Sequence, residues 1–87
     1  MTMSKENDYY ADENGFRRDI VERSSEYQKI SRQVEKEVKE ALAKKRILPG
    51  MLGYCQAFWS EKKKILKEKY GINWRSPQEM NPEISFD

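Results

Sequence analysis

The chain has 87 residues and a formal net charge of +2, and charged and hydrophobic residues each make up 37% of it. A chain of this length forms at most one small domain with a thin core. It contains no histidine, the commonest general base and metal ligand, and no glycine-rich phosphate loop, cysteine cluster or EF-hand spacing, so we expect a protein that is not an enzyme and has no cofactor or metal site.

The first fifteen residues, MTMSKENDYYADENG, carry one basic and four acidic side chains. Such composition is typical of segments that cannot bury enough apolar surface to fold. It predicts a disordered acidic segment over residues 1–15, followed by a single small helical domain over residues 16–87. The segment has no apolar run of the length that a signal peptide or a membrane span requires. We therefore expect a cytoplasmic protein without a membrane partner.

Apolar residues then recur in steps of three, four and seven, the pattern of one face of an amphipathic helix. They are Phe16, Ile20, Tyr27, Ile30, Val34, Val38 and Leu42. The uninterrupted phase favours one long helix over residues 16–46. The alternative is two helices that meet where Ser25 and Gln28 fit a capping box. Acidic and basic residues four apart, such as Glu35 and Lys39, are expected to pair on the solvent side of this helix.

The stretch RILPGMLG ends the first helix, because Pro49 disfavours helix at the residue before it and the glycines supply turn conformations. A second helix is predicted over roughly residues 53–70. Gly71 stands where a left-handed residue commonly ends a helix, and Ile72 can make the apolar contact that accompanies such an end.

Signals for a short third helix follow in SPQE, residues 76–79. Serine stands at the N-cap, proline at N1 and glutamate at N3, and the helix is expected to end before Asn81 and Pro82. The last five residues, EISFD, alternate polar and apolar and predict an extended tail. The fold class predicted is all-α: a helical hairpin of one long and one medium helix, a short C-terminal helix with an extended tail, and a disordered N-terminus.

The second helix lies in the basic middle of the chain, since residues 44–75 carry nine basic and two acidic side chains, a balance of +7. Projected at about 100° per residue, its apolar side chains gather on one face, which we expect to be buried with Phe58 and Ile65 as its anchors. Cys55 on this face is expected to be a small core residue. The face consists of Leu52, Cys55, Phe58, Trp59, Ile65, Leu66 and Tyr70.

Two lysines project into this apolar face. Lys62 and Lys69 are expected either to lay their stems along the core while the ammonium groups reach solvent, or to pair with the acidic tail. The carboxylates available in the tail are those of Glu79, Glu83 and Asp87.

The remaining cations suggest a surface for a partner. Lys63, Lys64 and Lys67 project on the face opposite the core, and Trp74 and Arg75 follow the end of the helix. Tryptophan and arginine are enriched where interfaces concentrate binding energy, so these five residues are predicted to form one partner-binding patch. Trp74 fits a core position equally well, and that alternative stays open here.

The stretch KKKILKEKYGINWRSPQEMNP, together with the terminal FD, resembles the carboxyl-terminal signature of short proteins encoded in Firmicute genomes and their mobile elements. The resemblance covers about the last 35 residues and implies no particular activity. It implies a phage-like or mobile-element context, in which small histidine-free proteins commonly bind a host or rival machine.

Two classes of function are compatible with these features. The favoured one is a bacterial protein-binding module, regulatory or inhibitory, whose separated charges steer association; an inhibitor of a nucleic-acid-handling defence enzyme, such as an anti-CRISPR protein, is one concrete form. The alternative is a small helical DNA- or RNA-binding protein that uses the basic segment over residues 44–75. Phosphate binding would weaken steeply with salt, which separates the two.

Overall fold

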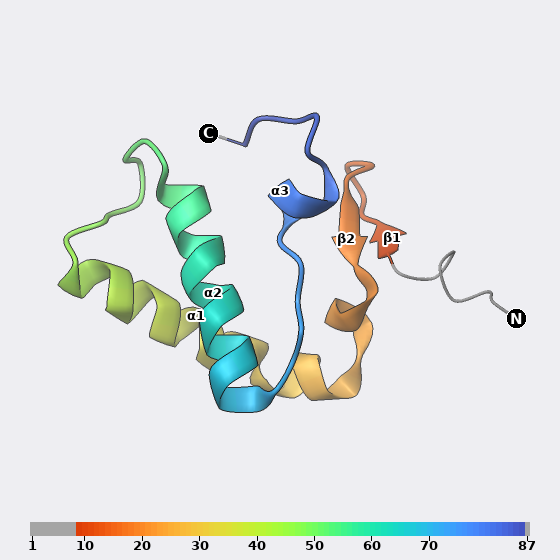
Figure 1. The fold of residues 1–87 in the computed structure, drawn as a ribbon, viewed down its shortest axis with the longest axis horizontal. Coiled ribbons are helices and arrows are strands. Elements are labelled where there is room, and N and C mark those ends of the chain that lie inside the picture. Colours follow the sequence, from red (N-terminus) through yellow and green to blue (C-terminus); the bar gives the residue numbers. More distant parts are fainter. Residues whose placement is uncertain (1–8, 87) are drawn as a thin grey trace, which may run out of the picture.

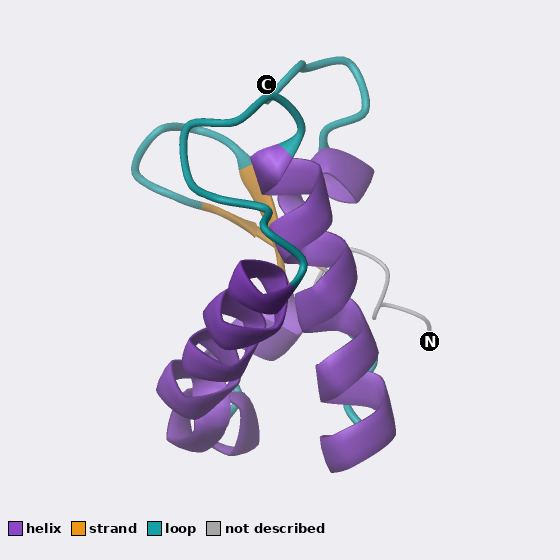
Figure 2. Cartoon of the chain, turned by 90° about the vertical axis from the view of Figure 1, so that its left-hand side faces the viewer, coloured by secondary structure: helices purple, strands orange, loops and turns teal. Residues whose placement is uncertain are grey.

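Two long helices pack across each other, and a small antiparallel pair of strands lies beside them (Figures 1 and 2). The structure is a computed structural model and describes residues 9–86. Its elements are β1 (Tyr9–Ala11), β2 (Arg17–Asp19), the 3₁₀ helix η2 (Ile20–Arg23), α1 (Ser25–Lys44), α2 (Tyr54–Tyr70) and α3 (Pro77–Met80). Within this described part, none of the helices is long and apolar enough to cross a bilayer.

The core lies mainly between α1 and α2. One face of α1 supplies most of it through four buried side chains, α2 adds Leu66, and Trp74 beyond α2 closes it. The four from α1 are Tyr27, Val34, Val38 and Leu42. They follow one another in steps of seven, four and four, so the predicted apolar stripe is confirmed for this part of the chain.

The single helix over residues 16–46 is wrong at its N-terminal end, because α1 begins only at Ser25. Ser24 is the N-cap: its backbone is extended (φ −71°, ψ 150°), and its Oγ accepts a hydrogen bond from the Tyr27 N–H at 3.1 Å. The weaker alternative, a break at the serine pair, was correct in position, although the cap is Ser24 and what precedes it is not an α-helix. Ile20, placed on the helical stripe, is exposed.

A β-hairpin replaces the predicted disorder over residues 9–15, while residues 1–8 lie outside the described part. Tyr9, Tyr10 and Ala11 pair with Asp19, Arg18 and Arg17 in antiparallel register. Asp12 shapes the turn, because its Oδ1 accepts the N–H groups of Asn14 and Phe16, and Gly15 takes the positive φ of 82° that the turn requires. The fold is therefore mostly helical but not purely all-α.

The predicted ends of α2 and α3 are confirmed. Gly71 adopts φ 67°, and the Ile72 N–H donates to the Leu66 carbonyl at 3.0 Å, as in a Schellman end. Ser76 caps α3 in a complete capping box with Glu79. Both ends depend on residues within six positions of one another, which is why sequence alone predicts them.

The C-terminal end of α1 has the same geometry without a glycine. Arg46 has φ 62°, and the N–H groups of Arg46 and Ile47 donate to the carbonyls of Ala43 and Leu42, each at 2.9 Å. Left-handed backbone costs a residue with a Cβ about 1–2 kcal/mol, so this turn is held against a local preference.

The buried face of α2 is narrower than predicted. Only Leu66 of its expected apolar residues is fully buried, whereas Phe58 and Ile65 are half-buried against the core and Cys55 is half-buried as well. Leu52 is 93% exposed, because it lies in the turn before α2 rather than on the helix. The core anchor on α2 is therefore Leu66.

Candidate partner-binding site

A short segment after α2 creates the site. Residues 72–76, which we call the strap, turn back at Gly71 and run alongside α2, between that helix and β2 (Figure 1). The strap is held by hydrogen bonds to β2 and η2. Asp19 Oδ2 accepts the Arg75 N–H at 2.8 Å, and Glu22 Oε2 accepts the Trp74 indole N–H, also at 2.8 Å.

A hollow of about 390 Å³ opens between α2 and the strap; we call it the basic hollow. Three cationic side chains line it, two from α2 and one from the strap. Its lining consists of Asp19, Lys63, Lys67, Ile72, Asn73, Trp74 and Arg75. Four of the five predicted partner-binding residues are thus brought to one place.

The cations of the basic hollow differ in how far they are neutralised. Lys63 pairs with Glu79 on α3, and Arg75 Nε lies 3.1 Å from Asp19 Oδ2. Lys67 is exposed and makes no ion pair or hydrogen bond with any described residue. As far as the described residues are concerned, Lys67 is therefore available to meet an incoming anion.

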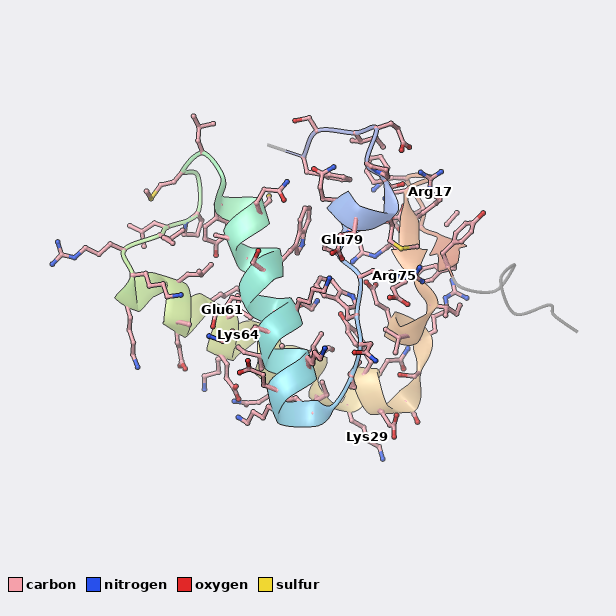
Figure 3. All side chains as sticks on the ribbon, in the orientation of Figure 1. Arg17, Lys29, Glu61, Lys64, Arg75 and Glu79 are labelled. Carbon is pink, nitrogen blue, oxygen red and sulfur yellow. The ribbon has the colours of Figure 1, made fainter. Side chains whose placement is uncertain are left out.

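Lys64 is not part of the hollow. It is exposed on α2 and does not line the hollow, and Figure 3 shows it beside Glu61, on the side of α2 away from the strap. It carries the same charge on the same helix and serves as a natural control for Lys63 and Lys67.

Trp74 was predicted on the partner surface and is instead a core residue. It is 1% exposed. Its ring lies under the ammonium group of Lys62, 4.7 Å from the ring centroid, and its indole N–H is satisfied by Glu22. A buried tryptophan needs both an apolar environment and an acceptor, and Glu22 supplies the acceptor from 52 positions away in the sequence.

The expected pairing of Lys62 and Lys69 with the acidic tail was wrong, since both bind carboxylates of α1. The expectation that the ammonium groups reach solvent fails for Lys62, whose side chain is 5% exposed, but fits Lys69, whose side chain is 55% exposed. Lys62 binds Glu35 at 3.2 Å, and Lys69 binds Glu37 at 2.8 Å. The carboxylates come from α1 rather than from the acidic tail, because α1 packs directly against the face of α2 that carries these lysines.

The tail is held by a different cation, Arg17, and by two aromatic contacts. Arg17 forms a two-pronged pair with Glu83, with both Nη2–O distances 3.0 Å, and its backbone exchanges hydrogen bonds with the Asn81 side chain at 2.9 and 2.8 Å. Phe86 packs edge-on against Phe16 and Trp59. Charge and aromatic contacts together hold the tail, but it is not extended as predicted: residues 82–84 form a turn in which the Ile84 N–H donates to the Asn81 carbonyl at 3.0 Å.

Two carboxylates essential to the site were missed. Asp19 and Glu22 are 5% and 8% exposed, and each accepts hydrogen bonds from the strap, while Glu22 also accepts from Tyr10 and Arg18. The only signal in the sequence is DENG before them, a turn motif that predicts a hairpin and would have placed them beside a strand.

Ionisation follows these contacts. Burial raises the pKa of Glu79, but hydrogen bonds from Lys63 and the Ser76 N–H outweigh it, so the pKa is lowered overall. Burial raises the pKa of Tyr27, with Glu22 and Glu35 adding to the effect. Within residues 9–86, no cluster of three or more His, Cys, Asp or Glu side chains has the geometry to hold a metal ion.

Comparison of the chain with protein-family models, curated proteins and solved structures gives no match.

Proposed function

We propose that this protein is a non-catalytic protein-binding module, a regulatory or inhibitory accessory of mobile-element type, and that its basic hollow receives an acidic side chain of the partner. The observation that carries the proposal is the convergence of Lys63, Lys67 and Arg75 on one hollow while Lys67 has no anionic partner among the described residues. A carboxylate that enters would form a charge-assisted hydrogen bond with Lys67, about twice as strong as a neutral one.

The composition of the hollow favours a protein over a nucleic acid at this site. Asp19 and Glu79 stand next to its cations and would repel a continuous phosphate backbone, whereas a single carboxylate can approach Lys67 alone. Trp74 is buried and cannot stack on a base, as single-strand binders require. The volume of about 390 Å³ suits one or two side chains of a partner.

The test compares two charge reversals on the same helix. Binding of a labelled peptide rich in aspartate and glutamate is measured by fluorescence anisotropy for the parent, Lys67→Glu and Lys64→Glu. We expect Lys67→Glu to weaken binding by about tenfold or more, equivalent to about 1.4 kcal/mol, and Lys64→Glu to have little effect. The same three proteins then serve as baits for capture from a host lysate.

Equal weakening by both variants would show that only net charge matters and would refute a site in the hollow. A captured protein that the Lys67→Glu bait retains in full would place the functional surface elsewhere. Circular dichroism of each variant confirms the fold, since both side chains are exposed and make no ion pair with the described residues.

A further inference from the structure

A row of cations on α1 lies outside the proposed site. Lys29, Arg32, Lys36 and Lys39 follow one another in steps of three, four and three, which places them on one face of the helix. All four are exposed. At 100° per residue this face is opposite the buried stripe that contains Val34. We call these four residues the α1 ridge; Figure 3 shows Lys29 pointing away from the rest of the molecule.

Two of the four carboxylates of the same helix are turned away from the ridge. Glu35 and Glu37 bind the lysines of α2 on the inner side of α1. The pair expected between Glu35 and Lys39 is therefore not formed. Across the described residues, none of the four ridge cations makes an ion pair or a hydrogen bond, so the packing of α1 on α2 leaves this row of positive charge uncompensated.

The shape of the ridge fits a groove between two rows of phosphates. From its first to its last residue the ridge rises about 15 Å at 1.5 Å per residue, and a helix is about 10–12 Å across with its side chains. The major groove of B-DNA is about 12 Å wide. A single helix with flexible cations along its outer face can therefore lie in the groove and reach phosphates on either side.

We propose that the α1 ridge binds the phosphate backbone of duplex DNA without sequence preference. Four contacts predict a slope of about −3.6 in the logarithm of the binding constant against the logarithm of salt concentration. Glu26 and Glu40 are exposed near the two ends of the ridge and keep the affinity in the non-specific range, about 10⁻⁴ to 10⁻⁶ M. This activity uses a different surface from the basic hollow and does not depend on it.

The experiment measures anisotropy of a labelled mixed-sequence duplex about two helical turns long, titrated with the full chain between about 50 and 200 mM salt. The parent is expected to lose affinity about 150-fold over that range. Replacing two ridge cations together, Arg32→Gln with Lys36→Gln, removes two contacts and is expected to reduce the slope by about 1.8 and the affinity at low salt by at least about tenfold.

The matched control removes the same charge from α2, as Lys64→Gln with Lys67→Gln. It is expected to bind the duplex within about threefold of the parent and to keep its slope, although it loses acidic-peptide binding if the hollow is used as proposed. The two proposals can therefore fail separately.

Three results would overturn the proposal: no binding of the duplex at the lowest salt, equal losses in the ridge and control variants, or a slope unchanged by the ridge substitutions. Binding to vesicles that contain phosphatidylserine, without binding to the duplex, would assign the ridge to a lipid surface and would also overturn it. Both double variants keep good helix formers at exposed positions, and circular dichroism verifies that they fold.

Discussion

The indole hydrogen bond of Trp74 is expected to be a large part of the stability of this small protein, and the chain offers a matched test. In Trp74→Phe the core keeps an aromatic ring while the buried Glu22 carboxylate loses the N–H donor 2.8 Å from its Oε2. Trp59→Phe makes the same chemical change where the ring is half-buried against Phe86 and its indole makes no hydrogen bond with the described residues.

The magnitudes follow from the two environments. Removing the donor of a buried hydrogen bond to a charged group costs about 1.5–3 kcal/mol. The smaller ring adds about 1 kcal/mol from lost apolar burial. We therefore expect Trp74→Phe to reduce the free energy of unfolding by about 2.5–4 kcal/mol and Trp59→Phe by about 1 kcal/mol or less.

Urea unfolding followed by far-ultraviolet circular dichroism measures both variants against the parent. A chain of 87 residues has a total stability of about 4–13 kcal/mol, so the expected loss is a large fraction of the total and is resolved by an unfolding curve. With a slope of about 1–3 kcal/mol per molar urea, the midpoint of Trp74→Phe should fall by about 1 M or more. Equal shifts for the two variants, or a Trp74→Phe stability within about 0.5 kcal/mol of the parent, would refute the importance assigned to the indole bond.

Three further predictions concern stability. Arg46→Gly relieves a residue at φ 62° and is expected to raise the stability by about 0.5–1 kcal/mol, seen as a rise of several degrees in the melting temperature; a lower melting temperature would mean that the arginine side chain stabilises the turn. Leu66→Ala is expected to cost about 2–5 kcal/mol, against less than about 0.5 kcal/mol for the exposed Leu52→Ala, both by urea unfolding; similar losses would contradict the assigned core. The pKa of Glu79 is lowered in the folded state, so the stabilisation that its carboxylate provides is complete at neutral pH. That stabilisation is lost as the pH falls below the usual pKa of about 4.5 and through the lower pKa of the folded state. Glu79→Gln should therefore flatten the decrease in stability over that acidic range, and an unchanged pH profile would exclude the effect.

Local signals in the sequence predict the end of α2 and both ends of α3. The Gly71 stop and the Ser76–Glu79 capping box are each complete within a few residues, so their geometry requires no knowledge of the rest of the fold. The apolar stripe of α1 likewise predicts Val34 and Val38 in the core.

What sequence reasoning missed depends on contacts across the chain. The helical spacing of apolar residues continues past Ser24 towards the N-terminus, and this predicted one long helix. The spacing there is a coincidence, because residues 17–19 pair with β1 instead of extending the helix. The burial of Trp74 was left open because its acceptor, Glu22, belongs to a segment whose fold was predicted wrongly. The ion-pair partner of Lys62, Glu35, depends on how α1 packs on α2. Periodicity predicts which faces of the two helices are buried but not which residues meet across them.

The hydrogen bonds between the strap and the segment β2–η2 also determine the order in which the protein can fold during synthesis. Glu22 and Asp19 leave the ribosome 52 and 56 residues ahead of their partners Trp74 and Arg75. At about 5–20 residues per second, these carboxylates and the β-hairpin wait roughly 3–10 s without the groups that bury them. Helix α1 can form in that interval, but the native core closes only after translation has passed the strap.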